Sequence, residues 1–149
     1  MKVGQYCKRS VVTIDVAADV AEAAKQMRLH HVGFLVVLDG QAIRRKPVGV
    51  ITDRDIVVQI DARDTDPRAL RVDEVMTRKP VVASENDDLS DLVQAMRLAG
   101  IRRVPVVDVA GSLCGVIATD DIIGVLTDLL CEIRGSFHQE QRVEHRVHG

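Results

Sequence analysis

The sequence has almost no aromatic residues: it contains no Trp, one Tyr and two Phe among its 149 residues. Proteins that bind single-stranded nucleic acid stack bases on aromatic side chains, so this composition disfavours that class. The net charge is also small, −2 with both signs interspersed, which disfavours a general affinity for DNA, RNA or anionic membranes. No apolar run approaches the roughly 18 residues that a membrane-spanning helix needs. We therefore expect a protein with no nucleic-acid or membrane partner.

Cysteine is scarce as well. The three cysteines are odd in number and form neither a paired disulfide framework nor a CxxC metal knuckle. The first residues, "MKVGQYCKRSVV", lack the apolar core of a signal peptide. We expect reduced thiols, no metal site and a cytoplasmic location.

What the sequence does contain is an internal repeat. At an offset of 69 residues, "KQMRLHHVGFLVVLD" (25–39) aligns with "QAMRLAGIRRVPVVD" (94–108). Three residues are then missing from the second copy, after which "GVI" at 49–51 matches "GVI" at 115–117. A length difference inside a repeat marks a surface loop.

Within each copy the hydrophobic period alternates between that of a strand and that of a helix. The pattern predicts the order β-α-β-β-α twice, an α/β fold. We predict a first repeat at 3–60, a linker at 61–71, a second repeat at 72–130 and a polar, partly disordered tail or oligomer contact at 131–149. Neither repeat can cover both faces of its small sheet alone, so the two repeats are expected to pack against each other with pseudo-two-fold symmetry.

The repeated frame resembles a known family. Each copy carries a strand preceded by a loop, "GIRRVPVVD" or its variant "HVGFLVVLD", and ends in "GVIxxxDI". This combination is similar to a tandem pair of cystathionine-β-synthase (CBS) domains, also called a Bateman module, over roughly residues 3–130. The resemblance implies a non-catalytic regulatory module that binds an adenosine-containing ligand (AMP, ATP, NAD or S-adenosylmethionine) in clefts between the repeats. It also implies a disc-shaped homodimer and an effector protein that the sequence does not identify.

By that resemblance, cleft A combines "TDRD" of the first repeat with the strand and loop of the second. Asp55 would accept hydrogen bonds from the ribose hydroxyls, Thr52 would donate to a phosphate, and the arginines would supply positive charge. Apolar side chains would enclose the adenine. The predicted residues of cleft A are Thr52, Arg54, Asp55, Val81, Val82, Ile101, Arg102, Arg103 and Pro105.

Cleft B would combine "ATDD" of the second repeat with the first repeat, and it departs from the family pattern. Ala118 stands where Ser or Thr is expected, and Gly33 and Phe34 replace the arginine pair. We therefore expect cleft A to be the main site and cleft B the weaker one. The predicted residues of cleft B are Val12, Thr13, Val32, Gly33, Phe34, Thr119 and Asp121.

Other interpretations of the same residues stay open. Thr52-x-x-Asp55 is also a helix-capping pattern, Asp53 fits a first-turn helix charge, and Arg102 with Arg103 fits a solvated surface pair. An enzyme would have to use Asp53 and Asp55 as an acid pair, since none of the common catalytic motifs is present. The alternative function is a protein-interaction or dimerisation module whose nucleotide clefts are vestigial.

Overall fold

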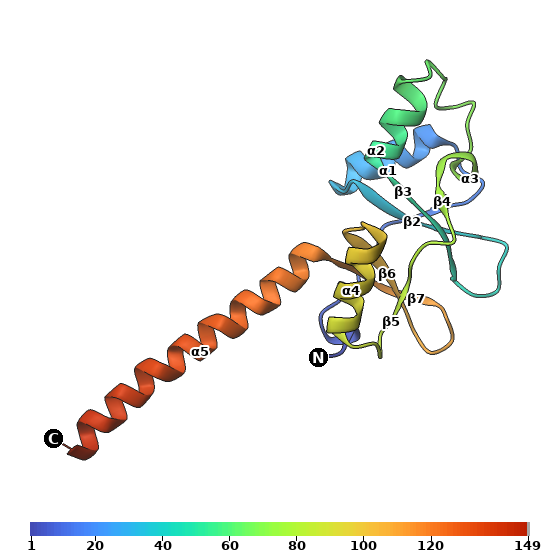
Figure 1. Cartoon of the computed structure of the whole chain (residues 1–149). Coiled ribbons are helices and arrows are strands. Elements are labelled where there is room, and N and C mark those ends of the chain that lie inside the picture. The colour runs from blue at the N-terminus through green and yellow to red at the C-terminus, as the bar shows by residue number, and fades with distance from the viewer. Residues whose placement is uncertain (149) are drawn as a thin grey trace.

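The computed structural model of the chain describes residues 1–148, without the side chains of 145, 147 and 148; Gly149, the last residue of the predicted tail, lies outside the described residues. The predicted order β-α-β-β-α occurs twice (Figure 1). The first half contains β1 (Thr13–Asp15), α1 (Val20–His30), β2 (Phe34–Leu38), β3 (Pro47–Thr52), α2 (Asp53–Ile56) and the π-helical turn η2 (Val57–Asp61). The second half contains β5 (Ala83–Ser84), α4 (Leu89–Ala99), β6 (Arg103–Val107), β7 (Leu113–Ala118) and α5 (Thr119–His148).

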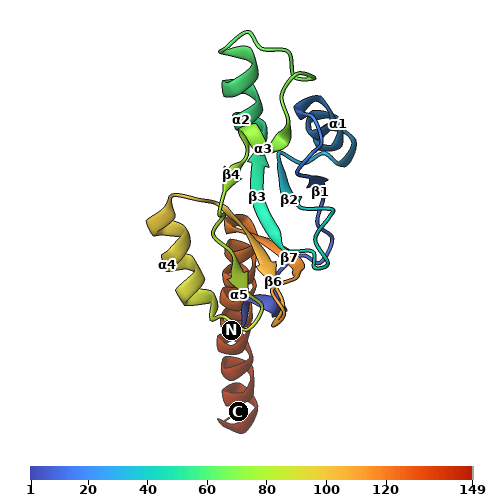
Figure 2. The ribbon, with the colours of Figure 1, turned by 90° about the vertical axis from the view of Figure 1, so that its right-hand side faces the viewer.

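Each half is built on its own small sheet. In the first sheet the order is β1-β2-β3-β4, and in the second it is β5-β6-β7. The first pair of strands in each half is parallel and the next pair is antiparallel. A register shift occurs at the corresponding place in both antiparallel pairs, between Val37 and Leu38 and between Val106 and Val107. The repeat seen in the sequence therefore extends to the irregularities of the backbone. Figure 2 shows the two halves one above the other.

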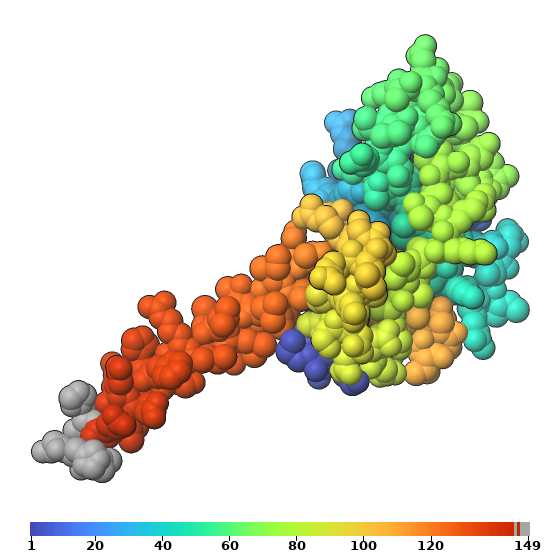
Figure 3. All heavy atoms as spheres, viewed as in Figure 1, coloured from blue at the N-terminus to red at the C-terminus, as the bar shows by residue number. Residues whose placement is uncertain are grey.

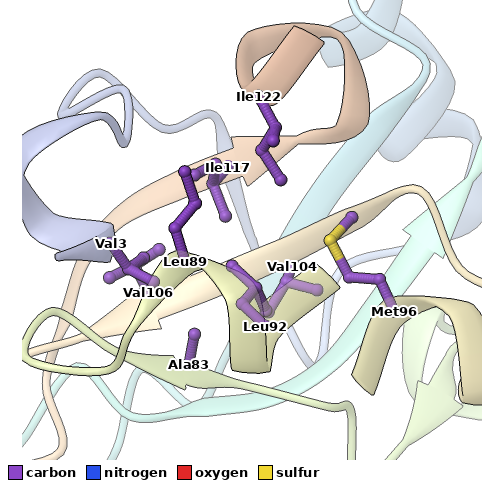
Figure 4. Close-up of a cluster of buried hydrophobic side chains, with 9 residues drawn as sticks. All are labelled: Val3, Ala83, Leu89, Leu92, Met96, Val104, Val106, Ile117 and Ile122. Atoms are coloured by element: carbon purple, nitrogen blue, oxygen red, sulfur yellow. The ribbon is translucent and has the colours of Figure 1, made fainter. Parts of the chain in front are cut away.

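The two repeats exchange their first segments. A short helix opens each repeat, η1 (Val3–Gln5) in the first and α3 (Val72–Val75) in the second. Val3 is fully buried in the core of the second half (Figure 4). Val72 is fully buried in the core of the first half. Strand β4 (Thr77–Arg78) then extends the first-half sheet beside β3. This reciprocal exchange ties the halves together through their hydrophobic cores.

Glycines in β3 and β7 make room for the exchanged segments. Gly49 of β3 and Gly115 of β7 are the first residues of the repeated "GVI". A Cβ at Gly49 would lie 3.0 Å from the carbonyl oxygen of Thr77, and a Cβ at Gly115 would lie 3.0 Å from that of Lys8. The closeness of the incoming backbone is thus a physical reason for glycine at this place in both copies.

Local signals define the ends of the long helices of the two halves. Asp19 caps the start of α1 by accepting a hydrogen bond from the backbone N–H of Glu22 at 2.8 Å. The C-caps of α1 and α4 are His31 and Gly100, both in the left-handed conformation, with φ of 53° and 67°. The corresponding end of each helix therefore turns in the same way.

The longer loop of the first half does not simply end in solvent. Arg44 donates from Nη1 to the carbonyl oxygen of Ala110 at 3.0 Å, and the N–H of Leu113 donates to the carbonyl oxygen of Arg45 at 2.8 Å. The extra residues of the first copy thus reach the β6–β7 loop of the second half.

Helix α5 is longer than the sequence predicts. The expected helix ends at residue 130 and is followed by a polar, partly disordered tail, whereas α5 continues to His148. It leaves the packed halves and extends as an arm (Figures 1 and 3). No helix among the described residues combines the length and apolar character needed to cross a membrane.

Candidate functional site

A cleft of about 670 Å³ lies where the two halves meet. One wall comes from β2, β3 and the start of α2 in the first half, and the other comes from the segment after β4 and the connection from α4 to β6. The site is composite, as expected for cleft A. The residues that line it are Phe34, Val50, Thr52, Asp53, Arg54, Asp55, Thr77, Lys79, Pro80, Val81, Ala99, Gly100, Ile101, Arg102, Arg103 and Pro105.

Thr52 and Asp55 form a reciprocal capping box at the floor of this cleft. The N–H of Asp55 donates to Thr52 Oγ1 at 3.1 Å, and the N–H of Thr52 donates to Asp55 Oδ2 at 2.9 Å. The helix-capping interpretation is therefore confirmed. Capping uses only one oxygen of the carboxylate, and no hydrogen bond to Asp55 Oδ1 occurs within the part of the chain that the structure describes. Oδ1 is available to a ligand hydroxyl, so the two interpretations are compatible.

Asp53, which we predicted mainly as a charge in the first turn of the helix, also lines the cleft. Its N–H donates to the carbonyl oxygen of Gly33 at 3.0 Å, and its Oδ1 accepts from the N–H of Arg54 at 2.8 Å. A Cβ at Gly33 would lie 2.6 Å from Asp53 Oδ2. Gly33, which we predicted for cleft B, therefore leaves space for an acid of cleft A.

Four basic side chains surround the two acids of cleft A: Arg54, Lys79, Arg102 and Arg103. Arg102 is 80% exposed, and its Nη2 lies 3.7 Å from Oδ1 of Asp120, which is itself 77% exposed. An ion pair as open as this contributes little to stability, so the guanidinium is free to contact an anion instead. Lys79 was absent from our prediction, because its position shortly before the strand "PVVA" carries no charge pattern of its own.

Apolar side chains form the rest of the cleft wall. Val81, Ile101 and Pro105 line it as predicted. Phe34, which we predicted for cleft B, lines this cleft: it stands opposite Thr52 in the pairing of β2 with β3, so its place is set by the first-half sheet. Val82 is 43% exposed and is not among the lining residues.

The residues predicted for cleft B have partners within the protein. Asp121 Oδ2 accepts from the N–H of Ala118 at 2.9 Å, and Asp121 Oδ1 lies 2.8 Å from Lys8 Nζ. Both oxygens of this carboxylate are thus engaged, in contrast to Asp55. Thr119 donates from Oγ1 to the carbonyl oxygen of Arg102 at 3.2 Å.

The first-half residues predicted for cleft B mainly stabilise the core and the sheet of the first half. Val12 and Val32 are partly buried and pack against the first-half core. Thr13 opens β1 and pairs with Val36 of β2. These positions hold the sheet together, and the arrangement offers less free polar chemistry here than at cleft A.

Lys8 explains part of the difference between the two clefts. At the repeat offset, its counterpart in the second copy is Thr77, which lines cleft A. Threonine carries no charge and does not reach across to Asp55 as the lysine reaches Asp121. Lys8 therefore forms an ion pair with the aspartate of one half, and its uncharged counterpart Thr77 cannot do the same in the other half.

Two α/β repeats that exchange their first segments, and a cleft between them that is lined by both acidic and basic side chains, define a two-repeat ligand-binding module. A comparison with protein-family models matches residues 3–61 and 72–128 to the CBS domain. The chain therefore belongs to the CBS domain family and is a tandem CBS pair.

Curated relatives share this unit at moderate identity. A protein of Methanopyrus kandleri is 29% identical over 89% of the chain, and the chain spans 66% of its length. The CBS domain-containing protein YhcV of Bacillus subtilis is 34% identical over 75% of the chain and 76% of its own length. An inosine-5'-monophosphate dehydrogenase of Methanocaldococcus jannaschii is 28% identical over 82% of the chain, but this region makes up only 23% of that enzyme.

Solved structures share the fold. A CBS domain protein from Pyrobaculum aerophilum complexed with AMP has a TM-score of 0.76 and 25% identity, and the match covers 88% of this chain and 99% of that one. The CBS domain pair of protein MJ0100, in complex with 5'-methylthioadenosine and S-adenosyl-L-methionine, has a TM-score of 0.72 and 26% identity, covering 86% and 97%. Both relatives hold adenosine-containing ligands.

Proposed function

We propose that the protein is a non-catalytic sensor that binds one adenosine nucleotide per chain in cleft A. The observation that carries this proposal is the asymmetry of the two equivalent aspartates. Asp55 retains an oxygen for a ligand, whereas both oxygens of Asp121 have protein partners. The adenosine ligands of the related CBS pairs support the ligand class.

The chemistry of cleft A suits each part of a nucleotide. Asp55 Oδ1 accepts from a ribose hydroxyl, as a carboxylate does well. Arg102, Arg103 and Lys79 balance the charge of a phosphate, and the arginines add forked donors. The apolar wall made by Phe34, Val81 and Ile101 accommodates the faces of a purine ring.

Binding without chemistry is the role that the same residues support best. Asp53 and Asp55, the acid pair that an enzyme would have to use, both accept hydrogen bonds at the start of α2, Asp53 Oδ1 from the N–H of Arg54 and Asp55 Oδ2 from the N–H of Thr52. One oxygen of Asp55 is already committed to capping α2, which fixes the carboxylate as a binding group. The match to the dehydrogenase covers only 23% of that enzyme, too little to transfer its activity.

A ligand in cleft A would contact both halves at once. It therefore signals to the extent that it binds one relative arrangement of the halves more tightly than another. The effector that responds to this change is outside the chain.

A thermal-shift panel of AMP, ADP, ATP, NAD and S-adenosylmethionine tests the proposal. At about 100 times its Kd, a ligand stabilises the folded state by about 2.7 kcal/mol, which raises the Tm by several degrees. We expect at least one ligand to give this shift in the wild type and in Asp121→Ala, and to give none in Asp55→Ala. The proposal is contradicted if none of the five ligands raises the Tm of the wild type. It is also contradicted if Asp121→Ala loses the shift while Asp55→Ala keeps it.

A further inference from the structure

Helix α5 leaves the body of the molecule as an arm (Figure 3). Along this arm it carries an apolar stripe. Ile122, in its first turn, is buried in the second-half core. Several of the apolar residues that follow are between 48% and 67% exposed. We call five of them the α5 seam: Ile123, Leu126, Leu130, Ile133 and Phe137.

The spacing of the α5 seam is that of a coiled coil. Successive members are separated by three, four, three and four residues, the a and d positions of a heptad repeat. The opposite side of the helix carries Gly124, Asp128 and Gly135 instead. The five side chains of the α5 seam therefore form one narrow strip, the shape that a second helix covers.

Little within α5 itself stabilises the arm. Gly135 lies in its middle, where glycine costs about 1 kcal/mol relative to alanine. Thr127 and Ser136 donate from their hydroxyls to carbonyl oxygens one turn earlier, at 2.9 and 3.1 Å, a contact that does not favour the helix. Within the described part of α5, no ion pair joins one turn to the next. Helices of this kind obtain most of their stability from packing.

The exposed apolar area fits a homodimer. The α5 seam exposes on the order of 600 Å² per chain, at the upper limit for the largest apolar patch of a monomer. Two such surfaces together bury roughly 1,200 Å², the lower end of the range for specific interfaces. A second copy of this chain therefore supplies a surface of the right size and pattern.

The charges of α5 select the orientation. Residues 119–132 contain four acids and no Lys or Arg, whereas residues 133–146 contain three Arg and two Glu. An antiparallel pair places the acidic part of one helix beside the basic part of the other and aligns the helix dipoles favourably. A parallel pair would place Glu140, at the next d position, against the partner's Glu140.

We propose that two copies of this chain pair antiparallel through the α5 seam. In the register that matches a with d positions, Leu126 packs against the partner's Phe137 and Leu130 against the partner's Ile133. The arrangement has two-fold symmetry and closes on itself, so it gives a dimer and not a filament. It involves the arm, not the faces of the two halves, and does not depend on a ligand in cleft A.

Sedimentation equilibrium on three full-length proteins tests the pairing. We expect the wild type to self-associate, and the double variant Leu130→Glu with Ile133→Glu to raise the dissociation constant of the α5 pairing at least tenfold, whether or not the disc-shaped homodimer also forms. The control, Cys131→Glu with Gln139→Glu, adds the same two charges on the opposite side and should dimerise as the wild type does. A monomeric wild type, or a seam variant that dimerises like the wild type, overturns the proposal.

A distance measurement keeps the proposal testable even if the seam variant folds poorly. Arg142→Cys, in a Cys131→Ser background, carries a spin label near the end of α5. In an antiparallel pair the two labelled positions are roughly 30 Å apart along the axis, whereas in a parallel pair they lie side by side. A distance near 30 Å or above supports the antiparallel seam, and one below about 20 Å overturns it.

Discussion

Lys8 Nζ lies 2.8 Å from Asp121 Oδ1, whereas Thr77, the counterpart of Lys8 in the second repeat, is uncharged and offers Asp55 no corresponding ion pair. The residue at this position of the repeat, Lys8 or Thr77, thus decides whether the nearby aspartate has a partner within the protein or keeps an oxygen for a ligand. Lys8 itself is 69% exposed, so the contact contributes little to stability and acts mainly by engaging the carboxylate.

Exchanging these two residues should shift binding between the clefts. Lys8→Thr releases Asp121, and we expect the number of nucleotides bound per chain in calorimetry to rise from one toward two. Thr77→Lys places a cation beside Asp55, and we expect the affinity of cleft A to fall at least tenfold. If Lys8→Thr changes neither stoichiometry nor affinity, Lys8 does not limit binding at cleft B.

The capping boxes give a second comparison between the repeats. Thr52→Ala removes the hydroxyl that accepts from the N–H of Asp55, and we expect the free energy of unfolding to fall by about 1 kcal/mol. Thr52→Ser keeps the hydroxyl and should have little effect. Ala118→Thr adds the missing hydroxyl before α5 and should stabilise the protein by up to about 1 kcal/mol. Urea denaturation measures all three, and equal stability of the Ala and Ser variants would contradict the assignment.

The exchanged segments should matter more than their positions in the chain suggest. Val3 is the third residue of the sequence yet is fully buried in the second half, so we expect Val3→Ala to cost about 2 kcal/mol. Val72→Ala should cost a similar amount in the first half. The control Val109→Ala, at a side chain that is 86% exposed, should be nearly neutral. A neutral Val3→Ala in urea denaturation would show that the first segment does not contribute to the core.

Thiol reactivity distinguishes the arm from the body. Burial raises the pKa of Cys7, with Arg9 opposing the shift, and burial likewise raises the pKa of Cys114. Their thiolate fractions at pH 8 are therefore low, and both are only partly accessible, whereas Cys131 is exposed. We expect a disulfide reagent to modify Cys131 first and the other two much more slowly, with their rates rising as the pH is raised. Equal rates for all three would contradict the burial of Cys7 and Cys114.

The sequence predicted the fold because each repeat carries its signals locally. The helical and strand periods, the acids at the helix starts and the paired "GVI" strands all concern residues close together in the chain. The exchange of Val3 and Val72 between halves joins residues far apart, and nothing in their local pattern indicates it. The length of α5 was also not predicted. The many polar residues beyond Leu130 suggested a tail, but in the structure this segment is a helix that also carries apolar residues on one side.

The candidate site was predicted where its residues belong to a local motif, and not where their place depends on contacts between distant segments. Thr52, Asp55, Ile101 and the two arginines of cleft A follow a motif and lie together in the structure. The place of Phe34 in cleft A was not predicted, because it depends on the pairing of β2 with β3. The contact of Lys8 with Asp121 could not be predicted either, since it depends on the exchange of the first segment.

A crystal structure of the protein with AMP, or with the ligand that gives the largest thermal shift, tests the central claim most directly. We predict difference density for one nucleotide per chain in cleft A, with a ribose hydroxyl within hydrogen-bond distance of Asp55 Oδ1 and the phosphate near Arg102 or Arg103. A ligand seated on Asp121 with cleft A empty would contradict the account.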